Sequence, residues 1–187
     1  MTTMKHSGAV RVLAISGSLR SASSNSALVD AAARLAPDGV EVSVFRGLAD
    51  IPPFNPDLDT DEAPSAVAAL RAAIEASDAI VISSPEYAHG VSGVLKNALD
   101  WLVSSGEMIH KPIALINASA RATHAHAALR ETLRTMSGLV ITEASITIAL
   151  DGTSLDAKRI AGDSHLSKLL VSALEFLARA TQAARAL

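Results

Sequence analysis

The chain of 187 residues contains no cysteine. This absence excludes structural disulfides, thiolate nucleophiles and cysteine-ligated metal sites. Aromatic residues make up only 3% of the chain, and no uninterrupted apolar run reaches the roughly 20 residues of a membrane-spanning helix. Basic residues number 16 against 19 acidic ones, so no positive excess favours nucleic acid as a partner.

The composition is that of a single folded domain. Apolar residues make up 49% of the chain and the net charge is only -3, which disfavours disorder and provides apolar surface for a core. Residues 1–8 are polar and lack the apolar stretch of a secretory signal, so we expect a flexible N-terminus followed by one domain over residues 9–187. We further expect a cytoplasmic protein that binds neither nucleic acid nor membrane.

Short apolar runs alternate with stretches of helical periodicity along the chain. The runs that predict strands cover residues 10–15, 40–45, 79–82, 112–116 and part of 139–150. The periodic stretches that predict helices start near Asn25, Pro64, Leu95, His126 and His165. Residues 47–63 and 151–163 are polar or rich in proline and glycine, and we expect loops there. This alternation predicts an α/β fold, in which a parallel sheet carries helices on both faces.

A serine-rich loop follows the first predicted strand. Hydroxyl groups come from Ser16, Ser18, Ser21, Ser23 and Ser24. Gly17 lets the backbone approach a ligand closely, Arg20 adds a planar charge that can bind two oxygens, and Asn25 is expected to cap the next helix. A helix N-terminus with such donors suits a phosphate group. An ordinary polar turn would contain the same serines, but Arg20 favours phosphate binding.

Related phosphate-binding loops do not match this segment. The chain has neither the G-x-G-x-x-G pattern of dinucleotide sites nor the G-x-x-x-x-G-K-[ST] pattern of NTPases. A low-molecular-weight tyrosine phosphatase would need a cysteine nucleophile. A receiver domain would need an acidic cluster, which Ile15-Ser16-Gly17 does not provide.

A second loop follows the third predicted strand, at residues 84–90. Pro85 stiffens the strand exit, Tyr87 offers an aromatic face, and His89 and Gly90 place polar or small groups near the turn. These features suit a flat ring that needs close backbone approach. Taken alone, they suit an ordinary strand-to-helix turn equally well, and Glu86 and His89 are more often solvated than catalytic.

Together the two loops resemble the NAD(P)H-dependent FMN reductase family of flavodoxin-like proteins, which includes quinone, azo-dye and chromate reductases. The resemblance rests on Gly-Ser-Leu-Arg at residues 17–20 with Ser23 and Asn25. It also rests on Pro-Glu-Tyr at residues 85–87, with Gly90 and with Leu-Lys-Asn-Ala-Leu-Asp-Trp at residues 95–101.

The resemblance implies a doubly wound, five-stranded parallel sheet in the order 2-1-3-4-5, with FMN as the cofactor. The FMN phosphate would be held by Ser16, Ser18, Arg20, Ser23 and Asn25. The isoalloxazine would be bordered by Pro85, Glu86, Tyr87, His89 and Gly90, with Ser119 on its other side. NADPH or NADH would donate hydride to the flavin. The electrons would then pass to a small acceptor, namely free FMN, a quinone, an azo compound or a metal oxyanion.

The resemblance also implies a homodimer or a homotetramer. A partner helix would be seated by Lys96, Asn97, Asp100 and Trp101. Phe54, at the tip of the long loop over residues 47–63, would reach a neighbouring subunit. Independently of the family, Lys96 and Asp100 have the i,i+4 spacing of an exposed ion pair.

Other interpretations stay open at this level. The chain is either an enzyme, a non-enzymatic flavodoxin-like electron carrier, or a module that binds another phosphorylated ligand. An electron carrier is usually strongly acidic, whereas this chain is nearly balanced. His124 and His126 have no obvious third metal ligand nearby, so we expect a polar helix start there. Arg121 either meets the phosphate of a nicotinamide cofactor or is a solvated charge.

Overall fold

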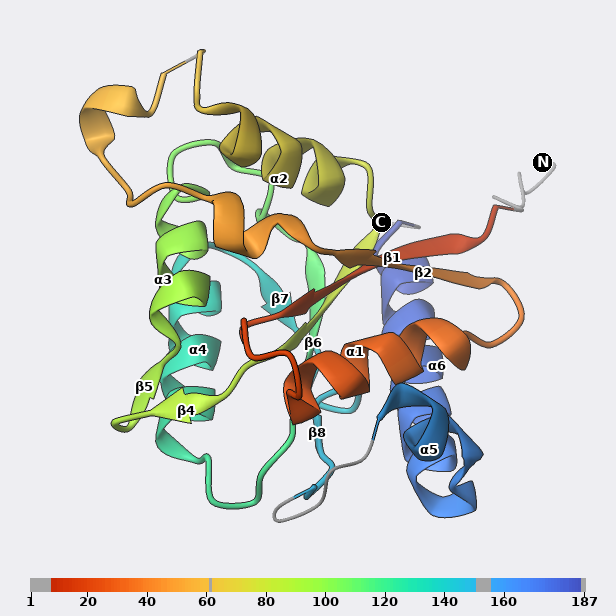
Figure 1. Cartoon of the computed structure of the whole chain (residues 1–187). Coiled ribbons are helices and arrows are strands. Elements are labelled where there is room, and N and C mark those ends of the chain that lie inside the picture. The colour runs from red at the N-terminus through yellow and green to blue at the C-terminus, as the bar shows by residue number, and fades with distance from the viewer. Residues whose placement is uncertain (1–7, 61, 151–155, 186–187) are drawn as a thin grey trace, which may run out of the picture.

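The computed structural model describes residues 8–60, 62–150 and 156–185. Its centre is a parallel sheet whose strands run in the order β2-β1-β3-β6-β7 (Figure 1). The strands are β1 (Val10–Ser16), β2 (Val40–Phe45), β3 (Ala79–Ser83), β6 (Pro112–Asn117) and β7 (Leu139–Val140). A further short strand, β8 (Ile146–Thr147), also pairs with β6 in parallel. The predicted α/β class and strand order are therefore confirmed, with the fifth strand divided in two.

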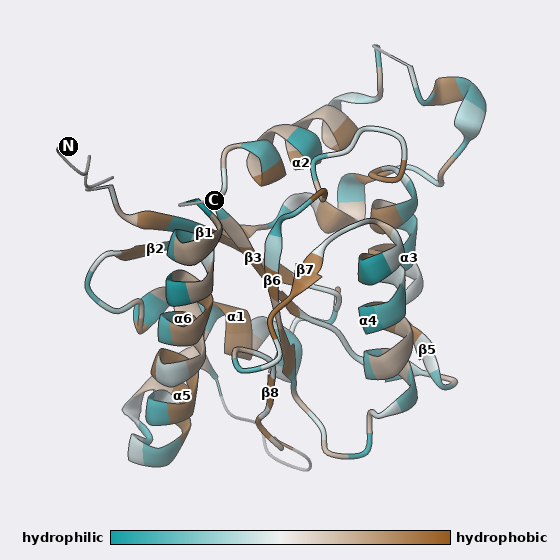
Figure 2. Cartoon of the chain, turned by 180° about the vertical axis from the view of Figure 1, so that it is seen from behind, coloured by the Kyte–Doolittle hydropathy of each residue, from teal (hydrophilic) through white to brown (hydrophobic). Residues whose placement is uncertain are grey.

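Helices cover both faces of the sheet (Figures 1 and 2). One face carries α1 (Ser24–Arg34), α5 (Ala157–Gly162) and α6 (Ser164–Ala184). The other carries α2 (Ser65–Glu75), α3 (Gly93–Asp100) and α4 (His124–Thr135). α6 extends over 21 residues, but within the described chain no helix combines the length and hydrophobicity needed to cross a bilayer.

The central strands are mostly apolar because both of their faces are buried over most of their length. In β1, Val10, Val12 and Ala14 pack beneath α1 and α6, whereas Leu13 and Ile15 pack beneath α2 and α3. Side chains of a strand point alternately to the two sides of the sheet, so one continuous apolar run supplies two cores. Figure 2 shows the same arrangement as apolar colour along the central strands.

The fifth strand is interrupted between β7 and β8. There the Ser145 side chain, in place of a backbone carbonyl, pairs with β6. The Ser145 hydroxyl accepts the Leu115 backbone N–H at 3.1 Å and donates to the Ile141 carbonyl at 2.7 Å. The backbone between β7 and β8 therefore leaves the ladder while β6 keeps a partner for its N–H group.

The expectation of a loop over residues 151–163 is wrong where the structure describes that segment. Residues 157–162 form α5, and the Asp156 side chain caps it by accepting the Arg159 N–H at 2.8 Å. The helix is too short for its apolar spacing to stand out, and only Ile160 is buried. Residues 151–155, and residues 1–7 of the predicted flexible N-terminus, lie outside the described residues.

The long loop over residues 47–63 is fastened to its own chain. The side chain of Asn97 accepts the Phe54 N–H at 2.7 Å and donates to the Pro52 carbonyl at 2.9 Å. The Trp101 indole N–H donates to the same carbonyl at 2.9 Å, and the Phe54 ring packs edge-on against the indole at 5.1 Å. The loop also contains two 3₁₀ turns, Gly47–Asp50 and Pro56–Leu58.

These contacts correct the interface expected for α3. Trp101 is 0% exposed in the single chain, so it belongs to the core and is not available to a partner helix. Asn97 and Phe54 likewise use their polar groups and ring within the chain. The expected exposed pair is confirmed, since Lys96 Nζ lies 2.5 Å from Asp100 Oδ1.

Asp78 joins three elements at the amino edge of the sheet. Its carboxylate accepts the Arg11 backbone N–H at 2.8 Å and lies 3.3 Å from the Arg11 guanidinium. It also lies 2.5 Å from the guanidinium of Arg185, just beyond the end of α6. Burial opposes ionisation of this carboxylate, but the hydrogen bonds from Arg11 and Arg185 outweigh it and lower the pKa of Asp78 to about 2.

We expect Asp78 to make stability depend on pH in the acid range. Because its pKa is lower in the folded chain than in the unfolded chain, its stabilisation is complete above about pH 4 and is lost as the pH falls through about 2. Urea unfolding at pH 6 should show Asp78→Asn to be less stable than the parent by about 2 kcal/mol. The difference should shrink steadily as the pH is lowered from 4 to 2; curves that stay parallel over this range would contradict the assignment.

Candidate functional site

Three loops meet at the carboxyl edge of the sheet, where open α/β sheets bind their ligands. The first loop (residues 16–25) follows β1, and the second loop (residues 84–92) follows β3. A third loop (residues 118–123) connects β6 to α4. Because β1, β3 and β6 are neighbours in the sheet, their loops are neighbours too.

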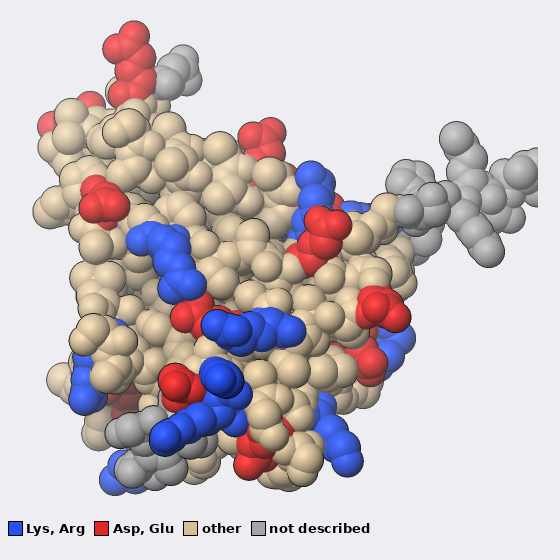
Figure 3. Space-filling view, turned by 45° about the vertical axis from the view of Figure 1, so that its right-hand side comes forward, with Lys and Arg blue, Asp and Glu red and all other residues tan. Residues whose placement is uncertain are grey.

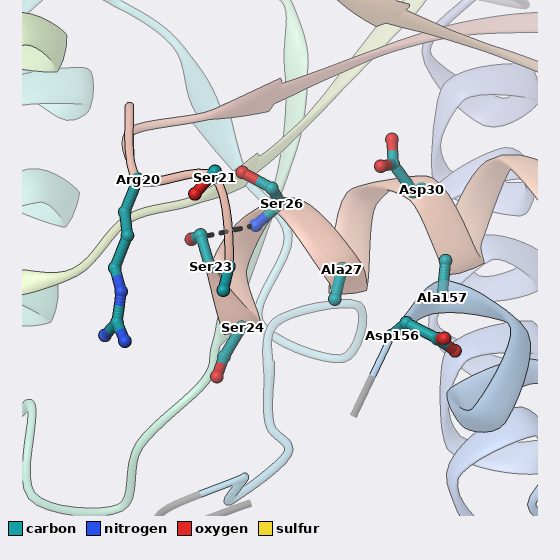
Figure 4. Close-up of a pocket in the computed structure, with 10 residues that line it drawn as sticks. Arg20, Ser21, Ser23, Ser24, Ser26, Ala27, Asp30, Asp156 and Ala157 are labelled. Atoms are coloured by element: carbon teal, nitrogen blue, oxygen red, sulfur yellow. Dashed lines mark hydrogen bonds between the residues drawn. The ribbon is translucent and has the colours of Figure 1, made fainter. Parts of the chain in front are cut away.

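A pocket of about 280 Å³ opens beside the first loop and the start of α1 (Figure 4). Its lining comes from Arg20, Ser21, Ala22, Ser23, Ser24, Ser26, Ala27, Asp30, Asp156 and Ala157. Serine hydroxyls and one guanidinium therefore surround a helix N-terminus, the donor set expected for a phosphate.

Several polar side chains of the first loop fix its shape. Ser23 caps α1 by accepting the Ser26 N–H at 3.3 Å, so the expectation that Asn25 is the cap is wrong. Asn25 is buried and accepts a hydrogen bond from the Ser83 hydroxyl at 2.9 Å. The Ser16 and Ser26 hydroxyls are hydrogen-bonded to each other at 2.9 Å. These bonds leave the loop preorganised before any ligand arrives.

Arg20 remains available for a ligand. Its side chain is exposed, and no hydrogen bond or ion pair with another described residue occupies the guanidinium. Figure 4 shows the side chain extending along the pocket, away from Asp30 and Asp156. An anion at this end of the pocket would meet a cation already in place, so the residues present fit a phosphate ester.

The opposite end of the pocket is acidic, which the sequence did not indicate. Asp156 caps α5, and Asp30 is paired with Arg46 at 2.6 Å. Ser26, Asp30 and Asp156 are site residues that the sequence analysis missed. Ser26 lies in the first turn of α1, directly after the serine-rich loop, and its place at the helix start could have been anticipated from the sequence. Asp156 lies far away in sequence and reaches the site only through the packing of α5 against α1.

Gly17 brings the first and second loops into contact. Its N–H donates to the Ser83 carbonyl at 2.8 Å. A Cβ at this position would lie 2.7 Å from Ser84 Oγ, 3.0 Å from Ser84 Cβ and 3.1 Å from Ser92 Oγ. A larger residue would therefore push the two loops apart. The sequence predicted a close approach of the Gly17 backbone to a ligand, whereas the close approach in the structure is to Ser84 and Ser92 of the second loop.

The second loop contains a small hairpin. Strands β4 (Glu86–Tyr87) and β5 (Gly90–Val91) are antiparallel, and Ala88 and His89 form the two-residue turn between them. Pro85 precedes the hairpin, and the Tyr87 side chain is 58% exposed. The Tyr87 ring is therefore accessible in the single chain, at the same edge of the sheet as the first loop.

The hairpin is attached to the start of α4. Glu86 accepts the Ala125 backbone N–H at 2.8 Å, and the His89 and His124 rings are stacked at 4.1 Å. His126, two residues after His124 in α4, is half-buried. Burial and the nearby Arg130 charge lower the pKa of its imidazole. Glu86 is expected to border the ring, and in the structure one of its carboxylate oxygens is hydrogen-bonded to the start of α4.

The third loop places Ser119 at the same edge of the sheet. Its N–H donates to the Asn117 side chain at 3.2 Å, and its hydroxyl accepts the Arg121 N–H at 3.2 Å.

Among the described residues no group of three or more histidine or acidic side chains is arranged to hold a metal ion. On the face drawn in Figure 3, basic and acidic side chains are interspersed.

Comparison with known proteins identifies relatives of the chain. The sequence pattern of the family described as NADPH-dependent FMN reductase matches residues 10–152. An NAD(P)H-dependent FMN reductase of Pseudomonas aeruginosa is 34% identical over 173 residues, which cover 90% of this chain and 93% of that protein. A quinone reductase of Escherichia coli is 39% identical over 94 residues, about half of each chain.

A solved structure extends the similarity to the fold. FerB of Paracoccus denitrificans, a flavoenzyme NAD(P)H:(acceptor) oxidoreductase, superposes with a TM-score of 0.68 and 26% identity. The superposition covers 91% of this chain and 98% of FerB. The flavodoxin-like architecture implied by the resemblance is thereby confirmed.

We expect Gly17→Ala to separate the two loops. The added methyl group cannot avoid the Ser84 Cβ by a side-chain rotation, so the backbone must move. The variant should lose about 1–3 kcal/mol of unfolding free energy and bind FMN about tenfold more weakly, measured by denaturant titration and flavin fluorescence. Gly93→Ala is the matched control, because nothing lies within 4 Å of its Cβ position. Equal behaviour of the two variants would refute the contact.

Proposed function

This chain belongs to the NADPH-dependent FMN reductase family, and we propose that it works as an FMN-dependent NAD(P)H oxidoreductase whose cofactor lies across the first and second loops. The observation that carries the proposal is the pocket at the N-terminus of α1. There the Arg20 guanidinium has no hydrogen bond or ion pair to another described residue and lies among serine hydroxyls of a preorganised loop. This arrangement favours a phosphate monoester at one end of the ligand.

The phosphate end of FMN would be held by the first loop. The Arg20 guanidinium would bind phosphate oxygens, and hydroxyls of Ser18, Ser21 and Ser24 would complete the shell. Ser16, Ser23 and Asn25 would act mainly by fixing the loop, since their side chains already bond within it or to β3. The positive end of the α1 dipole adds to the attraction.

The ring end would lie against the second and third loops. Pro85, Glu86, Tyr87, His89 and Gly90 would border one side of the isoalloxazine, and Ser119 the other. FMN, when bound, supplies the two-electron chemistry between the nicotinamide and the acceptor. The chain would hold and orient the ring through these loops, and we assign no side chain as a proton donor or nucleophile.

The acceptor we propose is a small planar molecule, a quinone or an azo compound. The exposed Tyr87 ring and the exposed Leu19 side chain give the site an apolar rim, which suits a flat and weakly polar substrate. The similarity to the E. coli quinone reductase supports the same class. Free FMN and metal oxyanions are the other acceptors of the expected set, and a comparison of turnover numbers would rank all four.

We also propose that the chain works in the cytoplasm as a homo-oligomer. Leu19 is 55% and Tyr87 58% exposed at the rim of the site, and a second copy would cover apolar surface of this kind. Light scattering of the purified protein should therefore give a multiple of 19.3 kDa. A single species of monomer mass would exclude the assembly and leave the fold and the cofactor site unaffected.

The function is tested by the visible spectrum of the protein with FMN, followed by anaerobic NADPH. We expect the flavin absorbance bands to shift when FMN binds and to bleach when NADPH is added. Arg20→Ala should weaken FMN binding about 10- to 100-fold, so that bleaching recovers only at high FMN concentration.

The matched control is Arg34→Ala, an exposed arginine at the far end of the same helix. It should leave FMN affinity unchanged. An unperturbed spectrum in the parent protein would exclude the flavin function, and equal affinity of the Arg20 and Arg34 variants would exclude the phosphate assignment alone.

A further inference from the structure

The turn of the second loop is held in an unfavourable backbone conformation. Ala88 has φ of 48° and His89 has φ of 62°, both in the left-handed region. A two-residue hairpin turn of this type normally contains Asn and Gly, because side chains with a Cβ are disfavoured there. The flanking strands have only two residues each, and so short a hairpin is not stable alone. Contacts outside the hairpin must hold its shape.

Those contacts come from the first turn of α4. The Glu86 carboxylate accepts the Ala125 N–H at 2.8 Å and fastens the base of the hairpin. The His124 ring stacks on the His89 ring at 4.1 Å with 17° between their planes, and fastens the tip. α4 itself is fixed to the core by Leu129 and Leu133. Figure 1 shows the hairpin lying beside α4.

We propose that His124 is a positioning residue for the flavin site, acting through its stack on His89. The stack holds the Ala88–His89 turn closed, and the closed turn sets the position of Tyr87 and of the hairpin backbone that faces the ring. The proposal rests on the proposed function, because it assumes that FMN lies against the second loop. In this proposal His124 affects the site through His89 and does not itself need to contact the flavin.

The stacked contact can be tested separately from a polar contact of the same side chain. A stacked contact needs a flat ring at that position, whereas a polar contact would need a nitrogen atom. His124→Phe therefore keeps the contact and His124→Ala removes it. His126 is on the same helical turn but has no stacking partner among the described rings, so His126→Gln serves as the matched control.

The first experiment measures FMN affinity by flavin fluorescence for the parent and these three variants at one fixed pH. His124→Ala should bind FMN about three- to tenfold more weakly than the parent. His124→Phe and His126→Gln should stay within about twofold of it. Equal weakening by Phe and Ala, or none by Ala, would overturn the proposal.

The second experiment relieves the backbone strain at Ala88 and tests whether the turn then depends less on His124. Asn tolerates positive φ far better than Ala, so Ala88→Asn should let the turn form without its anchor. In the His124→Ala background this substitution should restore most of the lost affinity, while in the parent it should change affinity by less than about twofold. Independent, additive effects of the two substitutions would contradict the proposed coupling.

A measurement without FMN separates this proposal from the function on which it rests. Hydrogen exchange of the FMN-free protein should be faster across residues 86–91 in His124→Ala than in the parent, His124→Phe or His126→Gln, with β1 and β3 unchanged. Absence of FMN binding by the parent would refute the flavin function. Unchanged exchange in the hairpin would refute the anchoring role of His124, whatever the affinity for FMN.

Discussion

The candidate site depends on the contact between the ends of β1 and β3. The parallel ladder pairs Ser16 with Ser83, and the Gly17 N–H extends it by one more bond to the Ser83 carbonyl. The Ser83 hydroxyl then bonds to Asn25 at the start of α1. A single residue of β3 thus fixes both the first loop and the helix behind it. Because Gly17 has no side chain, the two loops can lie against each other at this point.

This constraint divides the polar groups of the site into two kinds. Several of those in the first loop form hydrogen bonds within the loop or to β3, and these bonds fix its shape. Arg20 is left over, at the end of the pocket away from Asp30 and Asp156. Such an arrangement lowers the ordering cost of binding, because the donors are already in place. The second loop depends on a different support, namely the first turn of α4.

The fold was predictable from the sequence because its signals are local. A strand with two buried faces is an unbroken apolar run, as in β3 and β6, and a helix shows its buried side at regular spacing. The two loops of the site were found for the same reason, since each follows such a strand and combines unusual residues over a short distance.

What the sequence did not reveal are choices between hydrogen-bond partners. Asn25 and Ser23 are both suitable helix caps, and only the position of Ser83 decides that Asn25 turns toward β3. Trp101 and Asn97 have the spacing of an interface, but the carbonyl of Pro52 is brought to them by a loop more than forty residues away. Ser145 interrupts the fifth strand through a bond to β6 that no local pattern indicates. Each choice is made by tertiary packing.

The same reasoning explains why the chain has few side chains that look catalytic. If a bound flavin carries the chemistry, the rate depends on how the ring and its partners are oriented, and orientation is set by backbone and packing. In the second loop this includes two residues with positive φ, which persist only while their surroundings hold them. Residues that support the hairpin from α4 can therefore influence the site without touching the ligand.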